Sequence, residues 1–305
     1  MLKIKMFGAG QASLRGTDLP GFPQQQASQL LCYLLLNRNR SQPRERLAAV
    51  FWGQHSSATA RKYLRNALWR LGQLVSGAAS CEIQEYLNIS DTAIGFQPRA
   101  EYWLDIEAFE RSAAVCKSTA GASLSAEQAE GLETAVGLYE GDLLESIYED
   151  WTLYERERLR LLYIASLNKL MLYYGTQSRP EMGLAHGERI LALDPAREKI
   201  HRQMMWLYWL QGDRSAALAQ YKRCRQILRE EFGVRPMQET KRLYTAIRQN
   251  ADAPKAWSEE AGEPEAALRV SADALRQLHN LQKLADRIND ELRTLEGLLN
   301  QKPAD

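Results

Sequence analysis

Apolar and polar side chains alternate along the first residues of the chain. Leu2, Ile4 and Met6 are separated by Lys3 and Lys5. A period of two places every second side chain on the same face of a β-strand. The alternation resumes after a glycine-containing turn and stops at another such turn. We therefore expect short antiparallel strands at this point.

Three amphipathic helices are predicted after these strands. Over residues 24–37, apolar positions recur every three or four residues and fall on one helix face. Ser41 can cap a second helix, with Pro43 in its first turn, where a missing N–H does no harm. The same periodicity predicts a third helix over 59–75. Strand character returns over 82–97.

Strands, three helices and a terminal hairpin, in this order, are typical of a winged helix, which is a helix-turn-helix variant. We therefore predict a winged-helix DNA-binding domain (α+β) over residues 1–100. Its hairpin turns at Asp91 and Thr92 and is nearly uncharged, with Arg99 just beyond it. This wing can pass the DNA backbone in the neighbouring minor groove, or it can serve only to close the sheet.

Helical periodicity dominates the chain after Asp105. Prolines and glycines separate the segments, as at Asp194-Pro195. Helix pairs recur at about 34 residues, the period of tetratricopeptide-like repeats. The small side chains of Ala216 and Ala217 would let paired helices approach closely. We predict an all-α repeat domain over residues 101–250, so the chain as a whole is mostly α. The helices that stand out are expected over 127–139, 151–174, 181–193, 198–211, 214–231 and 237–249.

Five aromatic side chains of the repeat domain have two candidate roles. They can fill the core between the helices, which is the preferred interpretation. Some could instead line a groove on the concave side, where solenoid proteins bind their ligands. A small-molecule effector in the helical domain is therefore the second interpretation, and the sequence does not identify it. The five are Trp151, Tyr154, Trp206, Tyr208 and Trp209.

The C-terminal segment divides into a linker and a long helix. Residues 251–264 are polar and contain proline and glycine, which indicates a linker. Over 265–301, apolar residues alternate by three and four, which is heptad spacing. This helix can pack back on the repeat domain or form a coiled-coil homodimer, and the linker before it favours the dimer. The dimer seam would consist of Leu278, Leu281, Ile288, Leu292, Leu295 and Leu299.

The third helix carries the most specific functional signal. Its buried face is expected to hold Leu64, Ala67, Leu68, Leu71 and Val75. The opposite face contains amide and guanidinium groups but no acidic residue, and such forks match base edges in the major groove. The start of the helix is better placed for phosphates. The predicted DNA-binding set, wing included, is Thr59, Arg61, Lys62, Arg65, Asn66, Trp69, Arg70, Gln73, Thr92 and Arg99.

Two alternatives apply to this face. A solvated cationic helix would show the same residues, but the winged-helix order around the segment favours DNA reading. Trp69 can stack against a sugar or a thymine methyl group, or it can pack under the wing. The sequence favours neither of these two roles of Trp69 over the other.

The distribution of charge divides the chain into two unlike parts. The 305 residues suffice for two domains, and their net charge is +1. Residues 1–100 contain twelve Lys/Arg and five Asp/Glu, a net charge of +7, so the remainder carries −6. A basic part joined to an acidic part indicates a polyanion-binding module attached to a protein-binding module.

Sequence motifs for catalysis or cofactor binding are not found. The sequence contains no P-loop, no HExxH motif and no Cys/His metal spacing, so we expect a non-enzyme without metal or cofactor. Glu155 and Glu157 alternate with arginines, which favours a helical ion-pair strip. Neither a signal peptide nor a membrane-spanning run is seen, and the four cysteines form no CxxC pair. A cytoplasmic protein with reduced thiols, away from membranes, is therefore expected.

An ordered set of motifs resembles the SARP/AfsR-type regulators, which join an OmpR-like winged helix to a bacterial transcriptional activation domain. The motifs follow the order of that family over about 250 residues. Each is weak alone, but the ordered set is specific. They are Leu2–Gly8, Pro43–Trp52, Ala60–Leu71, Trp103–Phe109, Leu138–Leu144, Trp151–Leu159, Ala192–Pro195 and Ala217–Pro236.

The resemblance implies a transcription activator in which the third helix reads double-stranded promoter DNA, often as tandem direct repeats. It further implies that the helical domain recruits RNA polymerase and contacts other protomers. The family commonly has a second arginine after Arg70-Leu71, where this chain has Gly72, which removes a phosphate contact. The runner-up hypothesis is an interaction or signalling scaffold whose winged helix has lost sequence readout.

Overall fold

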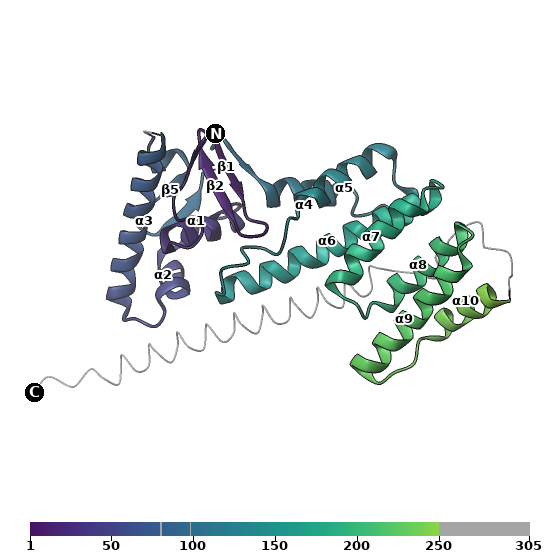
Figure 1. Ribbon diagram of the computed structural model, residues 1–305. Coiled ribbons are helices and arrows are strands. Elements are labelled where there is room, and N and C mark those ends of the chain that lie inside the picture. Colours follow the sequence, from purple (N-terminus) through teal and green to yellow (C-terminus); the bar gives the residue numbers. More distant parts are fainter. Residues whose placement is uncertain (80, 98, 250–305) are drawn as a thin grey trace, which may run out of the picture. The chain divides into compact units, whose positions relative to one another are not determined.

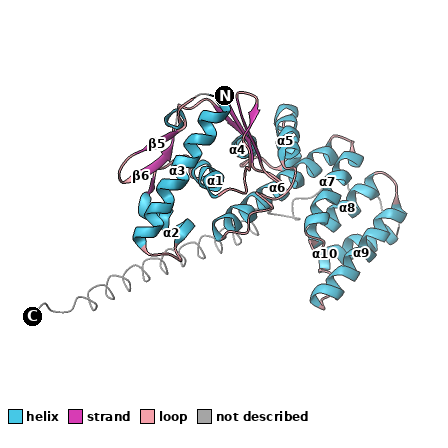
Figure 2. Ribbon diagram, turned by 60° about the vertical axis from the view of Figure 1, so that its left-hand side comes forward, coloured by secondary structure: helices cyan, strands magenta, loops and turns pink. Residues whose placement is uncertain are grey.

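The computed structural model describes residues 1–79, 81–97 and 99–249 (Figure 1). The predicted linker over 251–264, the helix over 265–301 and its heptad leucines lie outside the described residues. Within the described part, small sheets near the N-terminus are followed by a succession of helices (Figure 2). The prediction of a mostly helical fold, with a winged helix ahead of a helical repeat domain, is confirmed.

The first sheet brings both ends of the winged-helix region together. Its strand order is β3-β2-β1-β7, with β1 antiparallel to β2 and parallel to β7. Gly8 and Gly10 take positive φ angles in the turn between β1 and β2, a conformation that glycine adopts readily. The strands are β1 (Leu2–Lys5), β2 (Gln11–Leu14), β3 (Thr17–Asp18) and β7 (Tyr102–Leu104).

The second sheet contains the wing and corrects one prediction. The hairpin of β5 (Leu87–Ile89) and β6 (Ala93–Phe96) forms as expected, and β6 also pairs with β4 (Gln42–Pro43). The predicted helix cap at Ser41 is wrong, because β4 follows it and Pro43 precedes the first helical residue. The fixed φ of a proline suits both a short strand and the entry to a helix, so the sequence did not separate the two.

Three helices pack between and beside these sheets. They are α1 (Gln26–Leu36), α2 (Arg44–Trp52) and α3 (Ser57–Ala79). Leucines of α1 are among the most deeply buried residues, as the spacing of apolar positions over 24–37 predicts. A single 3-10 turn, η1 (Ile83–Glu85), leads from α3 to the wing, where a strand was expected.

The remainder of the described chain is helical, with one further 3-10 turn, η2 (Gly121–Ser123). Helix α6 packs on α7, α7 on α8, and α8 on α9. Gly187 of α7 permits one such approach, because a Cβ there would stand 2.8 Å from Met204 of α8. The helices are α4 (Asp105–Val115), α5 (Ala126–Leu138), α6 (Asp150–Thr176), α7 (Pro180–Leu193), α8 (Glu198–Leu210), α9 (Arg214–Phe232) and α10 (Gln238–Arg248).

The aromatic residues of the helical domain divide between two environments. Trp206 is 2 % exposed, while Tyr208 and Trp209 pack against a cluster that joins α8, α9 and α10. These three fill the repeat core as predicted. Trp151 does not, because its ring lies 5.7 Å from Tyr33 of the winged helix. The preferred core role is therefore wrong for Trp151.

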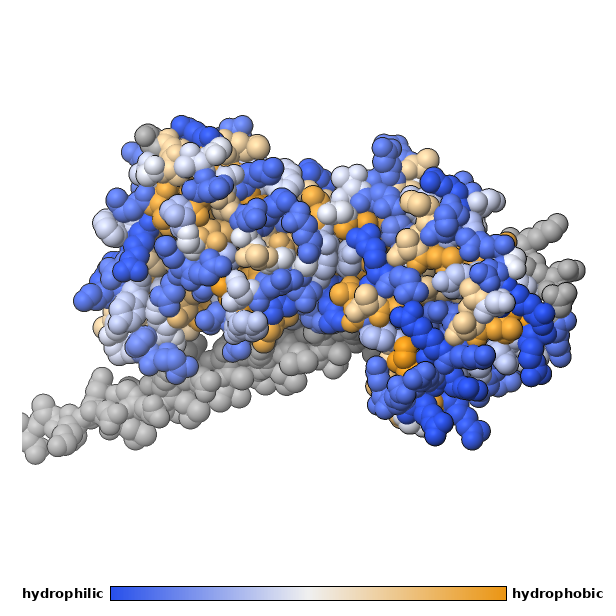
Figure 3. All heavy atoms as spheres, viewed as in Figure 1, coloured by the Kyte–Doolittle hydropathy of each residue, from blue (hydrophilic) through white to orange (hydrophobic). Residues whose placement is uncertain are grey.

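The face of the molecule in Figure 3 shows hydrophobic residues as scattered spots among hydrophilic ones, as is normal for a protein surface. No helix in the described part of the chain is long and apolar enough to cross a membrane.

Candidate nucleic-acid interface

Helix α3 begins at a side-chain cap that the sequence prediction missed. The Ser56 hydroxyl lies 3.4 Å from the backbone nitrogen of Thr59, and the Ser56 carbonyl accepts the N–H of Ala60 at 2.9 Å. A serine at this place satisfies donors that the first helical turn leaves free. The helix therefore starts at Ser57, two residues before the predicted start, and extends to Ala79.

The buried face of α3 is the predicted one. Leu64, Leu71 and Val75 are 1 % exposed, and Ala67 and Leu68 are also buried. This spacing fixes the opposite face toward solvent, because successive helical residues are rotated by about 100°. The helix contains no acidic residue.

Nine of the ten predicted DNA-contacting residues are exposed to solvent. Thr59 is the exception, since it is half-buried and its hydroxyl lies 3.0 Å from that of Ser56. The exposed residues of α3 in this set are Arg61, Lys62, Arg65, Asn66, Trp69, Arg70 and Gln73.

The cations of this face differ from several arginines elsewhere in the chain. Within the described residues, none of the four basic side chains of α3 makes an ion pair, although Arg38, Arg158 and Arg160 do. An unpaired cation on an exposed surface can neutralise a phosphate without first breaking an internal contact. The four are Arg61, Lys62, Arg65 and Arg70.

Trp69 stands free on this face. Its exposed fraction is 66 %, so the alternative in which it packs under the wing is wrong. Tyr63, which the sequence prediction missed, is 37 % exposed at the start of α3, and its ring lies 5.1 Å from that of His55. Tyr63 is also 6.4 Å from the Trp52 ring, so it links the exposed surface to α2.

The wing is held to the start of α2. Arg44 donates from its guanidinium to the Ser90 carbonyl at 2.8 Å, and from its backbone to the Thr92 carbonyl at 2.9 Å. Thr92 itself is exposed at the tip. Arg99 is not at the tip but beside the end of β6, where it lines an open hollow of about 550 Å³. The other lining residues are Gln84, Glu85, Asn88 and Gln97.

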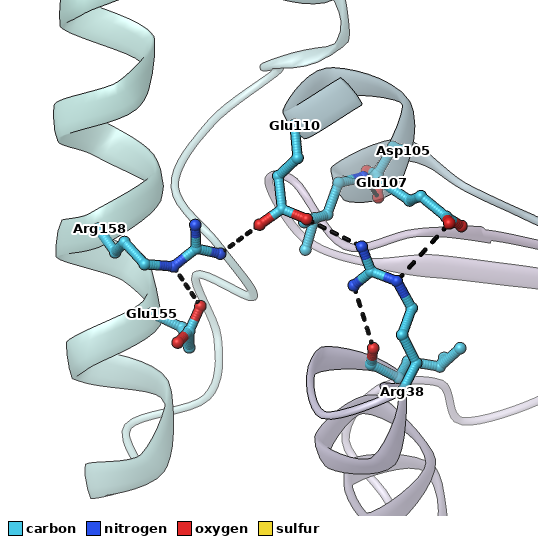
Figure 4. A network of polar contacts seen from close by, with 8 residues as sticks. Arg38, Asp105, Glu107, Glu110, Glu155 and Arg158 are labelled. Carbon is cyan, nitrogen blue, oxygen red and sulfur yellow. Dashed lines mark hydrogen bonds and ion pairs between the residues drawn. The ribbon is translucent and has the colours of Figure 1, made fainter. Parts of the chain in front are cut away.

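A network of ion pairs joins the winged helix to the helical domain (Figure 4). Glu110 of α4 accepts Arg38 at 2.9 Å on one oxygen and Arg158 of α6 at 2.5 Å on the other. Glu155 binds the same Arg158 at 2.7 Å. The predicted ion-pair strip is thus confirmed for Glu155, and Glu157 pairs with Arg160 at 3.8 Å.

The cysteines and the two buried histidines of the described residues lie apart from the exposed face of α3 and from the ion-pair network. No group of three or more His, Cys, Asp or Glu residues in this part of the chain could hold a metal ion. All four cysteines are unpaired and buried, and burial raises the pKa of each of their thiols. His186 stacks on Tyr174, and His201 is completely buried between α8 and α9.

The chain is similar to several known transcriptional regulators. Residues 104–248 match the family described as "Bacterial transcriptional activator domain". The transcriptional regulatory protein MoaR1 of Mycobacterium tuberculosis is 25 % identical over 251 residues, which are 81 % of this chain and 79 % of MoaR1. The regulatory protein AfsR of Streptomyces griseus is 28 % identical over 76 % of this chain, but only 23 % of AfsR is covered.

Over about four fifths of its length the chain is similar to transcriptional regulators of the SARP type. A SARP-type regulator was expected from the ordered motifs, and that expectation is confirmed. The solved structure of Mycobacterium tuberculosis EmbR, in complex with a low-affinity phosphopeptide, shares its fold with a TM-score of 0.71. It is 20 % identical and the match covers 89 % of this chain and 71 % of that chain.

Proposed function

We propose that this SARP-type regulator activates transcription by reading a promoter sequence with the exposed face of α3. The observation that carries the proposal is the combination of unpaired cations and amide groups on a helix without acidic residues. DNA carries one negative charge per about 1.7 Å of its axis, so such a face is attracted to it. The winged-helix framework supplies a rigid support of a kind that places a helix in the major groove.

Within this face, each residue type suits a different contact. Arg65 and Arg70 carry guanidinium forks that can donate to O6 and N7 of guanine, and the side-chain amides of Asn66 and Gln73 can pair with N6 and N7 of adenine. Arg61, Lys62 and Thr59 stand toward the start of the helix, where phosphates are favoured. Trp69, Thr92 and Arg99 are proposed to contact sugar or backbone.

The helical domain would supply the second function of an activator, which is contact with the transcription machinery. We propose that it recruits RNA polymerase, and the support is the match of residues 104–248 to an activator family. We further propose a cytoplasmic homodimer that pairs through the heptad leucines of the C-terminal segment. We also propose that the chain is divided into a winged helix, an activation domain, a linker and a terminal helix, with the bounds predicted from the sequence.

The first experiment is selection of bound sequences from a random duplex pool, with the full-length protein at near-physiological salt. Enrichment of a short motif, repeated at about one helical turn, would support sequence reading by tandem protomers. A pool that stays random, while binding falls with salt, would leave only phosphate contact. The scaffold hypothesis, with a small-molecule effector as its gate, would then replace activation.

A second experiment addresses polymerase recruitment. Transcription from a template bearing the selected motif is measured with purified bacterial RNA polymerase holoenzyme, with and without the protein. Stimulation that requires the motif supports activation. Tight motif binding without any stimulation would contradict recruitment and leave the DNA-reading part intact.

A further inference from the structure

Three aromatic rings meet where α6 passes the winged helix. The Trp151 ring of α6 lies 5.7 Å from Tyr33 of α1 and 5.8 Å from Phe51 of α2. Tyr33 and Phe51 are themselves 5.7 Å apart. The edge-on and tilted orientations at these distances are favourable for aromatic pairs. One side chain near the start of α6 therefore contacts two helices of the winged helix at once.

Phe51 is the penultimate residue of α2, and only Trp52 separates it from the turn that leads into α3. Its neighbour Trp52 is 5 % exposed, and the Trp52 indole N–H donates to the Gln26 side chain at 3.1 Å. The Trp52 ring lies 6.4 Å from Tyr63, which belongs to α3. Residues 53–56 are all that separate α2 from α3. A displacement of Phe51 would therefore be transmitted to the first turns of α3.

A second attachment fixes the orientation of α6 against the same domain. Arg158 binds Glu110, which also binds Arg38 at the end of α1 (Figure 4). Trp151 and Arg158 are seven residues apart, which is close to two helical turns and about 10 Å along the axis. Both side chains therefore lie on one face of α6. Two attachments on a rigid helix restrict rotation as well as distance.

We infer that Trp151 is a positioning residue for DNA recognition, which acts through Phe51 and the α2–α3 turn. This role rests on the proposed function, in which α3 reads DNA. A reading element must be held within about 0.5 Å of its productive position by the residues that support it. The helical domain would thus contribute to sequence readout without touching DNA.

The shape of the indole, and not its hydrogen bonding, carries the contact. The Trp151 Nε1 atom is buried and has no hydrogen-bond partner in the described part of the chain. Phenylalanine retains an aromatic ring and removes this unpaired donor, whereas alanine removes the ring itself. The two substitutions therefore distinguish loss of the indole N–H, together with part of the ring, from loss of the whole aromatic ring.

The test compares W151A, W151F and W209A in the full-length protein. Trp209 is a matched control, because it is another half-buried tryptophan of the helical domain, but it packs in the cluster of α8, α9 and α10. Affinity for the selected duplex is measured by fluorescence anisotropy, below the unfolding temperature of each variant. Hydrogen–deuterium exchange is followed over residues 53–60.

We expect W151A to lose about tenfold in affinity, which corresponds to about 1.4 kcal/mol, while W151F and W209A stay within about twofold of the parent. Exchange over residues 53–60 should accelerate in W151A alone. Parental affinity in W151A, or equal losses in W151F or W209A, would overturn the role. If the parent protein has no site preference, the proposed function fails instead, and unchanged exchange in W151A would still overturn the positioning role.

Discussion

The carboxylate of Asp105 accepts the backbone N–H of Met6 at 2.7 Å, although the two residues are 99 positions apart. The same oxygen accepts the N–H of Phe7 at 2.9 Å, and the other oxygen accepts the N–H of Ile106 at 2.7 Å. Asp105 is 1 % exposed, and this burial raises the pKa of its carboxyl group against the opposing effect of the three N–H donors. One side chain thus joins the end of β1 to the start of α4.

Substitution of Asp105 should weaken this joint. D105A removes the acceptor of three buried N–H groups, those of Met6, Phe7 and Ile106, and we expect a loss of about 1–3 kcal/mol of unfolding free energy for each group left unpaired. D105N keeps one acceptor oxygen but places an NH₂ group near another donor, so its loss should be smaller. Urea unfolding followed by circular dichroism measures both. An alanine variant as stable as the parent would contradict the assignment.

The exposed face of α3 gives a prediction for DNA affinity. R65A and N66A should each weaken binding to the selected duplex by about 1–3 kcal/mol, because each removes a fork that can read a base. K62A should weaken binding to all sequences alike and reduce the salt dependence by about one charge. Anisotropy titrations over a range of salt concentrations distinguish the two behaviours.

Lys222 of α9 offers a matched control for these variants. It is exposed, as Lys62 is, but it lies on the helical domain. K222A should leave both affinity and salt dependence unchanged. Equal effects of K62A and K222A would mean that net charge, and not the face of α3, governs binding.

Two helical glycines should respond to alanine in opposite directions. At Gly72 of α3, a Cβ would meet only Ile83, at 3.9 Å. G72A should therefore stabilise the protein by about 0.5–1 kcal/mol, since glycine is a poor helix former. At Gly175 of α6, a Cβ would stand 2.8 Å from the Trp206 ring, so G175A should destabilise it. Thermal unfolding of the two variants shows whether each substitution raises or lowers the stability of the protein. A G72A variant less stable than the parent would contradict the expectation.

Acid should destabilise the helical domain through His201. The Gln220 amide lies 2.9 Å from Nδ1 of the ring and the Pro195 carbonyl lies 2.8 Å from Nε2, an arrangement that suits a neutral imidazole. Burial lowers the pKa of His201 below its ordinary value of 6.5. At a pH between the lowered pKa of the folded protein and the ordinary value of 6.5, His201 is protonated in the unfolded chain but neutral in the folded chain. The free energy of unfolding therefore falls as the pH decreases below about 6.5.

The measurement is the urea midpoint of the parent and of H201Q at pH 7.5 and pH 5.5. The variant removes one titrating group, so its midpoint should change less between the two pH values. His186, whose pKa burial also lowers, keeps part of the acid effect in both proteins. Identical pH dependence in H201Q would contradict the role of His201.

Helical periodicity predicted the parts of the site that depend on one element alone. The buried face of α3 follows from the spacing of Leu64, Leu71 and Val75, and so does the exposure of Arg65 and its neighbours. The wing was found because alternation and a turn signal are both local. These features need no knowledge of what packs against the helix.

Contacts between elements were beyond the sequence pattern. Periodicity shows that Trp151 lies on a partly apolar face, but not that the face meets Tyr33 of another domain. The strand at Gln42–Pro43 is too short for alternation to be visible, because its pairing partner stands some fifty residues later in β6. Trp69 was ambiguous for a similar reason, since only the folded wing shows that nothing covers it.

The parallel pairing of β1 with β7 has a consequence for dividing this protein. A fragment that ends at residue 100 would lack β7 and leave one side of β1 without hydrogen-bond partners. Bare strand edges recruit strands from other molecules and lead to aggregation. The three residues of β7 therefore protect this edge of β1 within the molecule, and the winged helix depends on residues beyond position 100 for its solubility.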